Sequence, residues 1–500
     1  MMDWDGVASP LERSLAALER YASANAPDEV FLDDLQQRIG AARRASARSG
    51  SRVAGEGLGA SGASGASGAS HASGASGASS APIAPIMPSA SVPTSTPSTP
   101  DDAPRILLLG YTGAGNTGAD LRTIETIAQL HRVLAPRVPH ITLFALGDCF
   151  DHPLLADTPR LTPALPYLPD ALDAAVREAD LVLNVEGSTY TSKFSDSLAG
   201  VLIGGIALAH AHRRAAIAYG VDSGAMSAAL TRFVERNADG GEIICRNDAA
   251  RQQLASLGVL AQAGADTAWT YRARPEASGA APVARRVALC PNNPFWWPVR
   301  ADAARARELD ARGEASPLRY GPLHFHSWDA ARAEAYHAYL DRFAQIAVGL
   351  REQGYTPVLV GMEQLDHSAC TDLAARLPFE IELVTRGPRT LDEVAASVAH
   401  AACVVTTRYH AAVLAISHGV PVFGLSMDTR IERLLGEVGC PQWSAACDDA
   451  NGAQAALTAI GSLCRDEVRS ALVEAYADYA SVQRARIDAM GDRLRAVFSG

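Results

Sequence analysis

Two arginines and a histidine stand directly after apolar, strand-like segments of this sequence. Arg408 and His410 follow residues 403–407, and Arg246 follows residues 242–245. An arginine supplies a permanent planar cation, whereas a histidine exchanges a proton near neutral pH. Because ligands of parallel sheets bind beyond the carboxyl ends of the strands, these side chains are expected at a ligand-binding edge. Two arginines in separate halves predict one anion held between them, with two unrelated ion pairs as the alternative.

A glycine-rich turn, GYTGAGNTGAD at residues 110–120, separates a short buried strand from a segment with apolar residues at helical spacing. Glycines such as Gly115 allow the backbone to approach a ligand closely, and Asn116 tolerates unusual backbone angles. The turn matches neither the Walker lysine motif nor a strict G-x-G-x-x-G pattern. It therefore predicts either a ligand contact or only a tight turn.

Polar residues crowd the end of a further strand, in NVEGSTYTSK at residues 184–193. Glu186 and Ser188 are candidate substrate contacts, Glu186 either as a base or as a carboxylate that caps the next helix. Lys193 is the only lysine in the chain. It is either a site that needs a compact ammonium group or a chance survivor on a solvated loop. Trp297 lies in a long segment predicted to be irregular, where exposed aromatic rings are able to stack on a sugar.

Strands and helices alternate through most of the chain, which is typical of α/β domains with parallel sheets. We predict two Rossmann-like domains, residues 104–282 and 283–465, followed by a helix at 466–500 that packs back on the body. Residues 1–48 carry two helices, which form either a docking element for a partner or a lightly folded tail. Residues 49–103 are rich in glycine, alanine, serine and proline and predict a disordered linker.

The composition argues against several classes of protein. Hydrophobic residues make up 48% of the chain and the net charge is −11 without a basic cluster, which argues against nucleic acid or an acidic membrane surface as a partner. The eight cysteines are scattered, so neither a disulfide framework nor a metal site is expected, and a reducing cytoplasm fits. The first residues show no signal peptide, and the most apolar run, 198–211, is too short to span a bilayer.

Together these segments resemble the polysaccharide pyruvyl transferase family over roughly residues 105–439. The resemblance is carried by the glycine–asparagine turn, by ICRND around Arg246, by RYHAAVLAISHGVP from Arg408, and by the aspartate of ADTAW, Asp266. Each motif is modest, but their order and spacing make the resemblance fairly specific.

The resemblance implies two domains similar to the glycosyltransferase type B fold, with the active site in the cleft between them. It implies a transferase that moves a pyruvyl group from phosphoenolpyruvate to two sugar hydroxyls, forming a cyclic ketal and releasing phosphate. Phosphoenolpyruvate is the co-substrate, and no other cofactor and no metal is expected. Arg246 and Arg408 are expected to clamp the donor, which agrees with the fit of guanidinium to carboxylate and phosphate. His410 is expected to protonate the enol carbon or to assist phosphate departure.

Two other functions stay open from the sequence. One is a sugar-nucleotide-dependent glycosyltransferase of the same architecture, although a clear nucleotide-diphosphate signature is absent from the sequence. The other is a non-catalytic binding protein tethered through residues 1–100. Ala119 replaces an aspartate common in the family, and Val185-Glu186-Gly187 replaces three glycines. These departures leave the acceptor more open than the donor.

Overall fold

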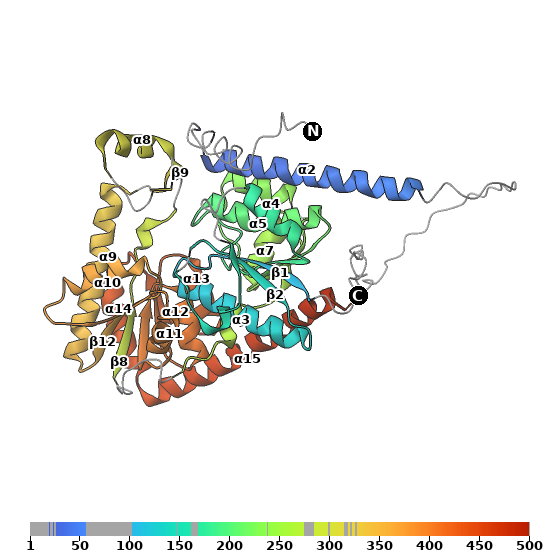
Figure 1. The fold of residues 1–500 in the computed structure, drawn as a ribbon. Coiled ribbons are helices and arrows are strands. Elements are labelled where there is room, and N and C mark those ends of the chain that lie inside the picture. Colours follow the sequence, from blue (N-terminus) through green and yellow to red (C-terminus); the bar gives the residue numbers. More distant parts are fainter. Residues whose placement is uncertain are drawn as a thin grey trace, which may run out of the picture.

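The structure is a computed structural model of the whole chain. It describes residues 20, 24, 27–56, 103–147, 149–161, 169–237, 239–274, 285–298, 301–314, 319–320, 323–325 and 328–499. Most of the predicted linker and nearly all of the first predicted N-terminal helix lie outside these residues. The described part forms two α/β domains side by side, with the N-terminal domain on the right and the C-terminal domain on the left of Figure 1.

The N-terminal domain is built on a seven-stranded parallel sheet with the strand order β3-β2-β1-β4-β5-β6-β7. Its strands are β1 (Arg105–Leu109), β2 (His140–Phe144), β3 (Arg160–Leu161), β4 (Leu181–Asn184), β5 (Ala215–Val221), β6 (Glu242–Cys245) and β7 (Gln262–Ala263). Its helices are α3 (Thr117–Leu134), α4 (Pro169–Glu178), α5 (Asp196–Ala211), α6 (Ala228–Arg236) and α7 (Asp248–Ser256). Apart from Arg105 and Asn184 at their ends, the central strands β1 and β4 are apolar, as expected for a sheet with helices on both faces.

The C-terminal domain repeats this plan with a six-stranded parallel sheet in the order β13-β12-β8-β14-β15-β16. Its strands are β8 (Arg286–Cys290), β12 (Thr356–Gly361), β13 (Glu382–Thr385), β14 (Cys403–Thr406), β15 (Val422–Ser426) and β16 (Ser444–Ala446). Its helices are α9 (Ala330–Glu352), α10 (Asp366–Ala374), α11 (Leu391–Ala399), α12 (Tyr409–Ser417), α13 (Thr429–Glu437) and α14 (Gly452–Leu463). Two parallel-sheet, Rossmann-like domains confirm the predicted fold class.

An insertion between β8 and α9 departs from the irregular segment that the sequence predicts. It contains β9 (Ala301–Asp302), helix α8 (Ala303–Arg312), β10 (Arg319–Tyr320) and β11 (Leu323–Phe325), and its strands form a small antiparallel sheet. The Asp302 side chain caps α8 by accepting a hydrogen bond from the Arg305 amide at 2.8 Å. The insertion stands out from the C-terminal domain, and β9 lies against α2 (Pro27–Glu56) (Figure 1).

Helix α2 packs along α5 of the N-terminal domain and extends into the range predicted as a linker. Its apolar face is buried at Phe31, Leu32, Leu35, Ile39 and Ala42. Two glycines of α5 make room for it: a Cβ atom added at Gly204 would lie only 2.3 Å from Leu35 Cδ2. The apolar face of this helix is therefore covered by the domain of its own chain.

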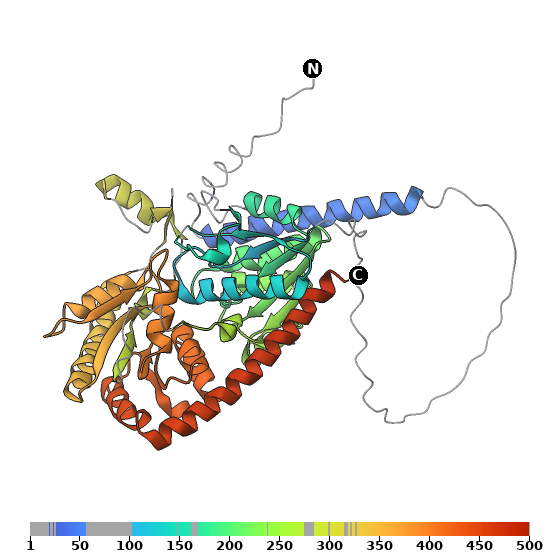
Figure 2. The ribbon, with the colours of Figure 1, turned by 60° about the horizontal axis from the view of Figure 1, so that its bottom comes forward.

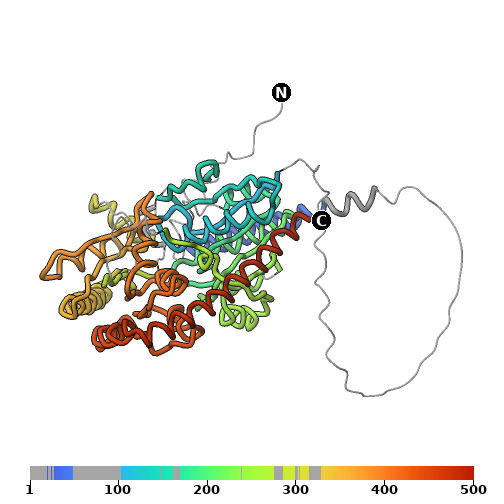
Figure 3. Tube along the Cα trace, turned by 90° about the horizontal axis from the view of Figure 1, so that it is seen from below, coloured from blue at the N-terminus to red at the C-terminus, as the bar shows by residue number. Residues whose placement is uncertain are grey.

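Helix α15 (Asp466–Val497) joins the two domains along one side of the molecule, as Figure 2 and Figure 3 show. It packs against α12 in the C-terminal domain and against α3 in the N-terminal domain. The Gln129 side chain of α3 donates a hydrogen bond to the Ile487 carbonyl at 2.7 Å. None of the helices in the described ranges is long and apolar enough to cross a membrane.

Candidate active site

The glycine-rich turn is one place where the backbones of the two domains are hydrogen-bonded to each other. The Thr117 amide donates to the Met362 carbonyl at 2.8 Å, and the Gln364 amide donates to the Gly115 carbonyl at 2.9 Å. Gly115 has a φ of +70°, which favours glycine. The Asn116 side chain accepts a hydrogen bond from the Ala119 amide and so caps α3. Both predicted substrate contacts in this turn thus shape the interdomain contact.

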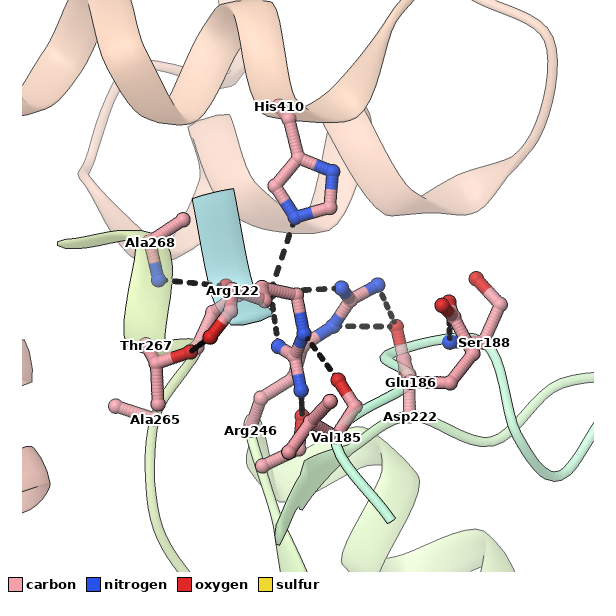
Figure 4. A network of polar contacts seen from close by, with 12 residues as sticks. Arg122, Val185, Glu186, Ser188, Asp222, Arg246, Ala265, Thr267, Ala268 and His410 are labelled. Atoms are coloured by element: carbon pink, nitrogen blue, oxygen red, sulfur yellow. Dashed lines mark hydrogen bonds and ion pairs between the residues drawn. The ribbon is translucent and has the colours of Figure 1, made fainter. Parts of the chain in front are cut away.

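Asp266 is the centre of a buried polar network between the domains. Its partners Arg122, Arg246 and His410 are drawn in Figure 4. Its side chain is 1% exposed, and its Oδ2 atom accepts a hydrogen bond from Arg246 Nη1 at 2.9 Å. Arg122 Nη1 lies 2.7 Å from the same atom as an ion pair, and His410 Nε2 lies 3.3 Å away. Although burial acts to raise it, the neighbouring Arg122, His410 and Arg246 hold the pKa of Asp266 well below its usual range.

Each guanidinium nitrogen of Arg246 has a hydrogen-bond partner. Its Nε and Nη2 atoms donate to Asp222 Oδ2 at 3.0 and 2.6 Å, and its Nη1 atom donates to Asp266. The guanidinium carbon also lies 4.2 Å from the ring centre of Tyr409, which belongs to the C-terminal domain. A Cβ atom added at Gly187 would lie 2.6 Å from Nη1, so the absence of a side chain there leaves room for the guanidinium.

Arg122 is a member of the network that the sequence analysis missed. It comes from α3, where its Nε atom donates to the Val185 carbonyl at 2.7 Å and Nη2 donates to the Tyr219 and Gly220 carbonyls at 3.0 and 2.9 Å. The side chain is 1% exposed. Most residues of α3 are buried, and a buried arginine needs a carboxylate or hydrogen-bond acceptors as partners.

His410 reaches the network from the first turn of α12 (Figure 4). Its ring lies over Gly118 at the start of α3: a Cβ atom added there would be 1.9 Å from Nδ1. Burial lowers the pKa of His410, and the Asp266 carboxylate opposes this effect. The shift favours the neutral form of the imidazole. Its contact with a carboxylate assigns the proton to Nε2, which leaves Nδ1 as the acceptor.

Arg408 faces a different set of carboxylates, in its own domain. Its Nε atom donates to Asp366 Oδ2 at 2.9 Å, and its Nη2 atom pairs with Asp366 Oδ1 and with Glu363 Oε2, the latter at 2.8 Å. Within the described residues its Nη1 atom has no partner, and the side chain is 14% exposed. The structure thus brings Arg246 and His410 onto one carboxylate and pairs Arg408 with separate acids of its own domain.

A second buried ion pair links the domains next to these residues. Arg386 Nη2 lies 2.6 Å from Asp120 Oδ2, and both side chains are fully buried. Burial raises the pKa of Asp120 to about 7, against the opposing effect of Arg386. Arg386 follows strand β13, so the strand-end rule that singled out Arg246 also identifies it.

The remaining predicted contacts divide into two groups. Glu186 accepts hydrogen bonds from the Tyr111 and Ser188 amides at 3.2 and 3.0 Å, so it closes a loop beside Asp222 and has no contact with His410 in Figure 4. Lys193 and Trp297 lie near each other by way of Phe194, whose ring meets that of Trp297 edge to face at 5.0 Å. These two predicted residues form a separate group of contacts, joined through Phe194.

Comparison with protein families gives a match to the polysaccharide pyruvyl transferase model over residues 215–429. The matched region contains Arg246, Asp266, Arg408 and His410. It confirms the resemblance predicted from the sequence and, with it, the prediction of an enzyme of the transferase class. A comparison with curated protein sequences gives no significant match.

Solved structures similar to this chain include a complex with UDP-glucose, a glycosyltransferase and an epimerase. Anabaena HepE, in complex with UDP-glucose, is 14% identical and covers 78% of this chain and 99% of its own, with a TM-score of 0.45. A glycosyltransferase from Rickettsia africae is 8% identical and covers 80% of this chain and 100% of its own, with a TM-score of 0.47. UDP-GlcNAc 2-epimerase from Neisseria meningitidis is 8% identical and covers 77% of this chain and 99% of its own, with a TM-score of 0.45.

Proposed function

We propose that this protein transfers a pyruvyl group from phosphoenolpyruvate to two hydroxyls of a sugar or related acceptor, forming a cyclic ketal and releasing phosphate. The observation that carries the proposal is the family match over residues 215–429. The pairing of His410 with Asp266 across the two domains supports it, because pyruvyl transfer needs a group that moves protons between two substrates.

The balance of the reaction defines what such a group must do. Each of the two acceptor hydroxyls loses a proton and forms a bond to the central carbon of the donor. One proton goes to the methylene carbon, which becomes a methyl group, and the other leaves with the phosphate as its C–O bond breaks. A side chain that begins neutral, accepts a proton and gives it up again suits this sequence.

His410 has these properties in the proposed mechanism. Its Nδ1 atom takes the proton of the attacking hydroxyl and passes it to the enol carbon or to the departing phosphate. Asp266 holds Nε2–H, which fixes the tautomer and the ring orientation and stabilises the imidazolium while it exists. Arg122 and Arg246 act through Asp266, because each guanidinium holds that carboxylate in place.

Arg408 is the arginine that we assign to the donor. Phosphoenolpyruvate carries a carboxylate and a phosphate, both of which suit a planar guanidinium. Arg408 keeps Nη1 without a partner in the described part of the chain, and its side chain is partly exposed. Arg246 is 1% exposed, and a direct contact with the donor would require Asp222 to be displaced. The predicted clamp formed by both arginines therefore stays a prediction, with Arg408 as its accessible half.

Donor binding is the first test, with phosphoenolpyruvate and UDP-glucose as probes in calorimetry. We expect phosphoenolpyruvate to bind, and Arg408→Ala to weaken it about tenfold or more, since a hydrogen bond to a charged group contributes about 1.5–3 kcal/mol. Arg493→Ala, which removes a surface pair with Glu242, is the matched control and should bind as wild type. Binding of UDP-glucose without binding of phosphoenolpyruvate would favour a glycosyltransferase and overturn the proposal.

Turnover is the second test. The protein is incubated with phosphoenolpyruvate and cell-derived glycans, and phosphate release is followed together with the mass gain of a pyruvyl ketal on the acceptor. His410→Ala should reduce the rate by about 10²–10⁴-fold, the share of a positioned acid–base group. Phosphate release that His410→Ala leaves unchanged would remove the histidine from the mechanism.

A further inference from the structure

Five side chains from both domains meet in a group that we call the aromatic–cation cluster: Lys193, Phe194, Trp297, Asp428 and Arg430. The first two lie in the loop after β4, Trp297 lies in the loop after β8, and the last two lie after β15, at the start of α13. Every one of these loops follows the carboxyl end of a parallel strand, which is the edge where α/β proteins bind their ligands. All five side chains are half-buried, so each keeps some exposed surface.

The aromatic part of the cluster is a corner between two rings. Phe194 and Trp297 meet with an angle of 81° between their planes. Arg430 lies over Phe194, with 5.3 Å between the guanidinium carbon and the ring centre. Asp428 holds Arg430 in place by accepting hydrogen bonds from Nε and Nη2 at 2.7 to 3.0 Å. A rigid corner of half-exposed rings from two domains is suited to contact the apolar face of a sugar.

Lys193 is the cation of the cluster with spare hydrogen-bonding capacity. An ammonium group has three donors, and within the described residues Nζ has one hydrogen-bond acceptor, the Met427 carbonyl at 3.4 Å. The nearest carboxylate oxygen belongs to Asp428, at 4.0 Å, and Arg430 already occupies that carboxylate. Two cations against one carboxylate leave the cluster with one positive charge in excess.

A continuous path of contacts connects this cluster with the proposed catalytic residues. Thr407, which precedes Arg408, donates a hydrogen bond to Asn292 Oδ1 at 2.8 Å. The Asn292 amide in turn contacts Met427 Sδ at 3.3 Å, and the Met427 carbonyl accepts from Lys193. Strands β14 and β15, which lead into Arg408 and Met427, are neighbours in the sheet. A ligand on the cluster would therefore lie at the same sheet edge as Arg408.

We propose that the aromatic–cation cluster binds the acceptor, and that this acceptor is a sugar carrying a negative charge as a carboxylate or a phosphate. The inference rests on the proposed function. Phe194 and Trp297 contact the sugar ring, and the free donors of Lys193 take the anionic group. The excess positive charge then favours a charged acceptor over its neutral counterpart.

The test compares three probes that share one ring: glucose, glucuronate and glucose 6-phosphate. Their binding to the full chain is measured by ligand-observed NMR in the presence of phosphoenolpyruvate. We expect both anionic sugars to bind about tenfold or more tightly than glucose, the effect of one charge-assisted hydrogen bond. Equal binding of all three probes to the wild-type protein would overturn the inference without the need for any variant.

Two variants separate the parts of the cluster. Lys193→Met should abolish the preference for the anionic sugars, whereas Lys193→Arg should keep the preference. Trp297→Ala should weaken all three probes to a similar degree, because the ring contact is common to them. A preference that survives in Lys193→Met would show that another cation is responsible and would contradict the assignment.

Phosphoenolpyruvate binding is measured on the same samples to separate the two proposals. If phosphoenolpyruvate binds to wild type and to Lys193→Met alike while no charge preference exists, the acceptor inference fails and the proposed function stands. If phosphoenolpyruvate does not bind while the preference exists and depends on Lys193, the cluster is a site for anionic sugars and the proposed reaction fails.

Discussion

Replacing Gly118 with alanine tests whether His410 must lie over the start of α3. The added methyl carbon would be 1.9 Å from Nδ1 and 2.3 Å from Cγ of the histidine. Non-bonded heavy atoms need about 3.5 Å, so the imidazole must move by about 1.6 Å. A movement of this size breaks the 3.3 Å contact between Nε2 and Asp266, because a hydrogen bond does not persist beyond about 3.5 Å.

Two opposing effects set the stability of this variant. Alanine in place of glycine within a helix stabilises it by up to about 1 kcal/mol. Loss of the bond from His410 to a charged carboxylate costs about 1.5–3 kcal/mol. We therefore expect Gly118→Ala to lower the free energy of unfolding by about 0.5–2 kcal/mol. Turnover should fall by about 10²-fold or more, since the proton-transfer group is displaced.

The assay pairs urea unfolding with phosphate release from phosphoenolpyruvate. Gly461→Ala is the matched control: this glycine lies in α14, and a Cβ atom added there meets nothing within 4 Å. The free energy of unfolding of this control should rise by a few tenths to about 1 kcal/mol, and its activity should be unchanged. If Gly118→Ala gains as much stability as the control and turns over at the wild-type rate, the placement and the role of His410 are both wrong.

Three further substitutions probe the buried charges and the N-terminal helix. Asp266→Asn leaves two buried guanidinium groups without their shared carboxylate and should cost about 3–5 kcal/mol in urea unfolding, so an unchanged midpoint would refute the pairing. Asp120 has a pKa of about 7 in the folded chain against 3.8 as its ordinary value, so the folded state holds a proton that the unfolded state releases between about pH 4 and 7. The contribution of Asp120 to the free energy of unfolding should therefore fall as pH rises through this range, by up to about 1.4 kcal/mol per pH unit. The difference in free energy of unfolding between wild type and Asp120→Asn, measured at several pH values, should show this slope. Leu35→Ala should lower the free energy of unfolding by about 2–5 kcal/mol. Leu260→Ala, at a side chain that is 90% exposed, should change it by no more than about 0.5 kcal/mol. Similar losses in the two variants would show that α2 is not part of the core.

Strand positions and strand-end residues were accessible from the sequence because both depend on local patterns. Runs such as RILLL and CVVT mark buried strands, and the polar residue after each run must lie at the carboxyl edge of the sheet. The rule places Arg246 and His410 at the carboxyl edges of their sheets, but it does not predict that they share the carboxylate of Asp266. Asp222, at the end of β5, satisfies the same rule and was missed only because its segment resembles no motif.

The partners of each charge could not be predicted, because they depend on how two domains face each other. Arg408 pairs with Asp366 and Glu363, which precede it by more than forty positions and lie beyond a different strand. Arg122 joins the network from a helix face that amphipathic patterns assign to the core. Helix α8 was missed for another reason: half of its residues are charged and Leu309 is its only large apolar residue, so it has no apolar stripe to reveal its period.

The last helix of the chain extends the site well past the region that carries its motifs. The match to the family model ends at residue 429, yet the Ala265 amide, next to Asp266, donates to Met490 Sδ at 3.2 Å. Tyr479 also packs edge to face on Trp269 with 5.4 Å between ring centres. Helix α15 thus supports the loop that carries Asp266, and we call this contact the brace. A chain cut after α14 would keep both sheets but lose this brace, so any domain exchange between relatives must carry the terminal helix along with the first domain.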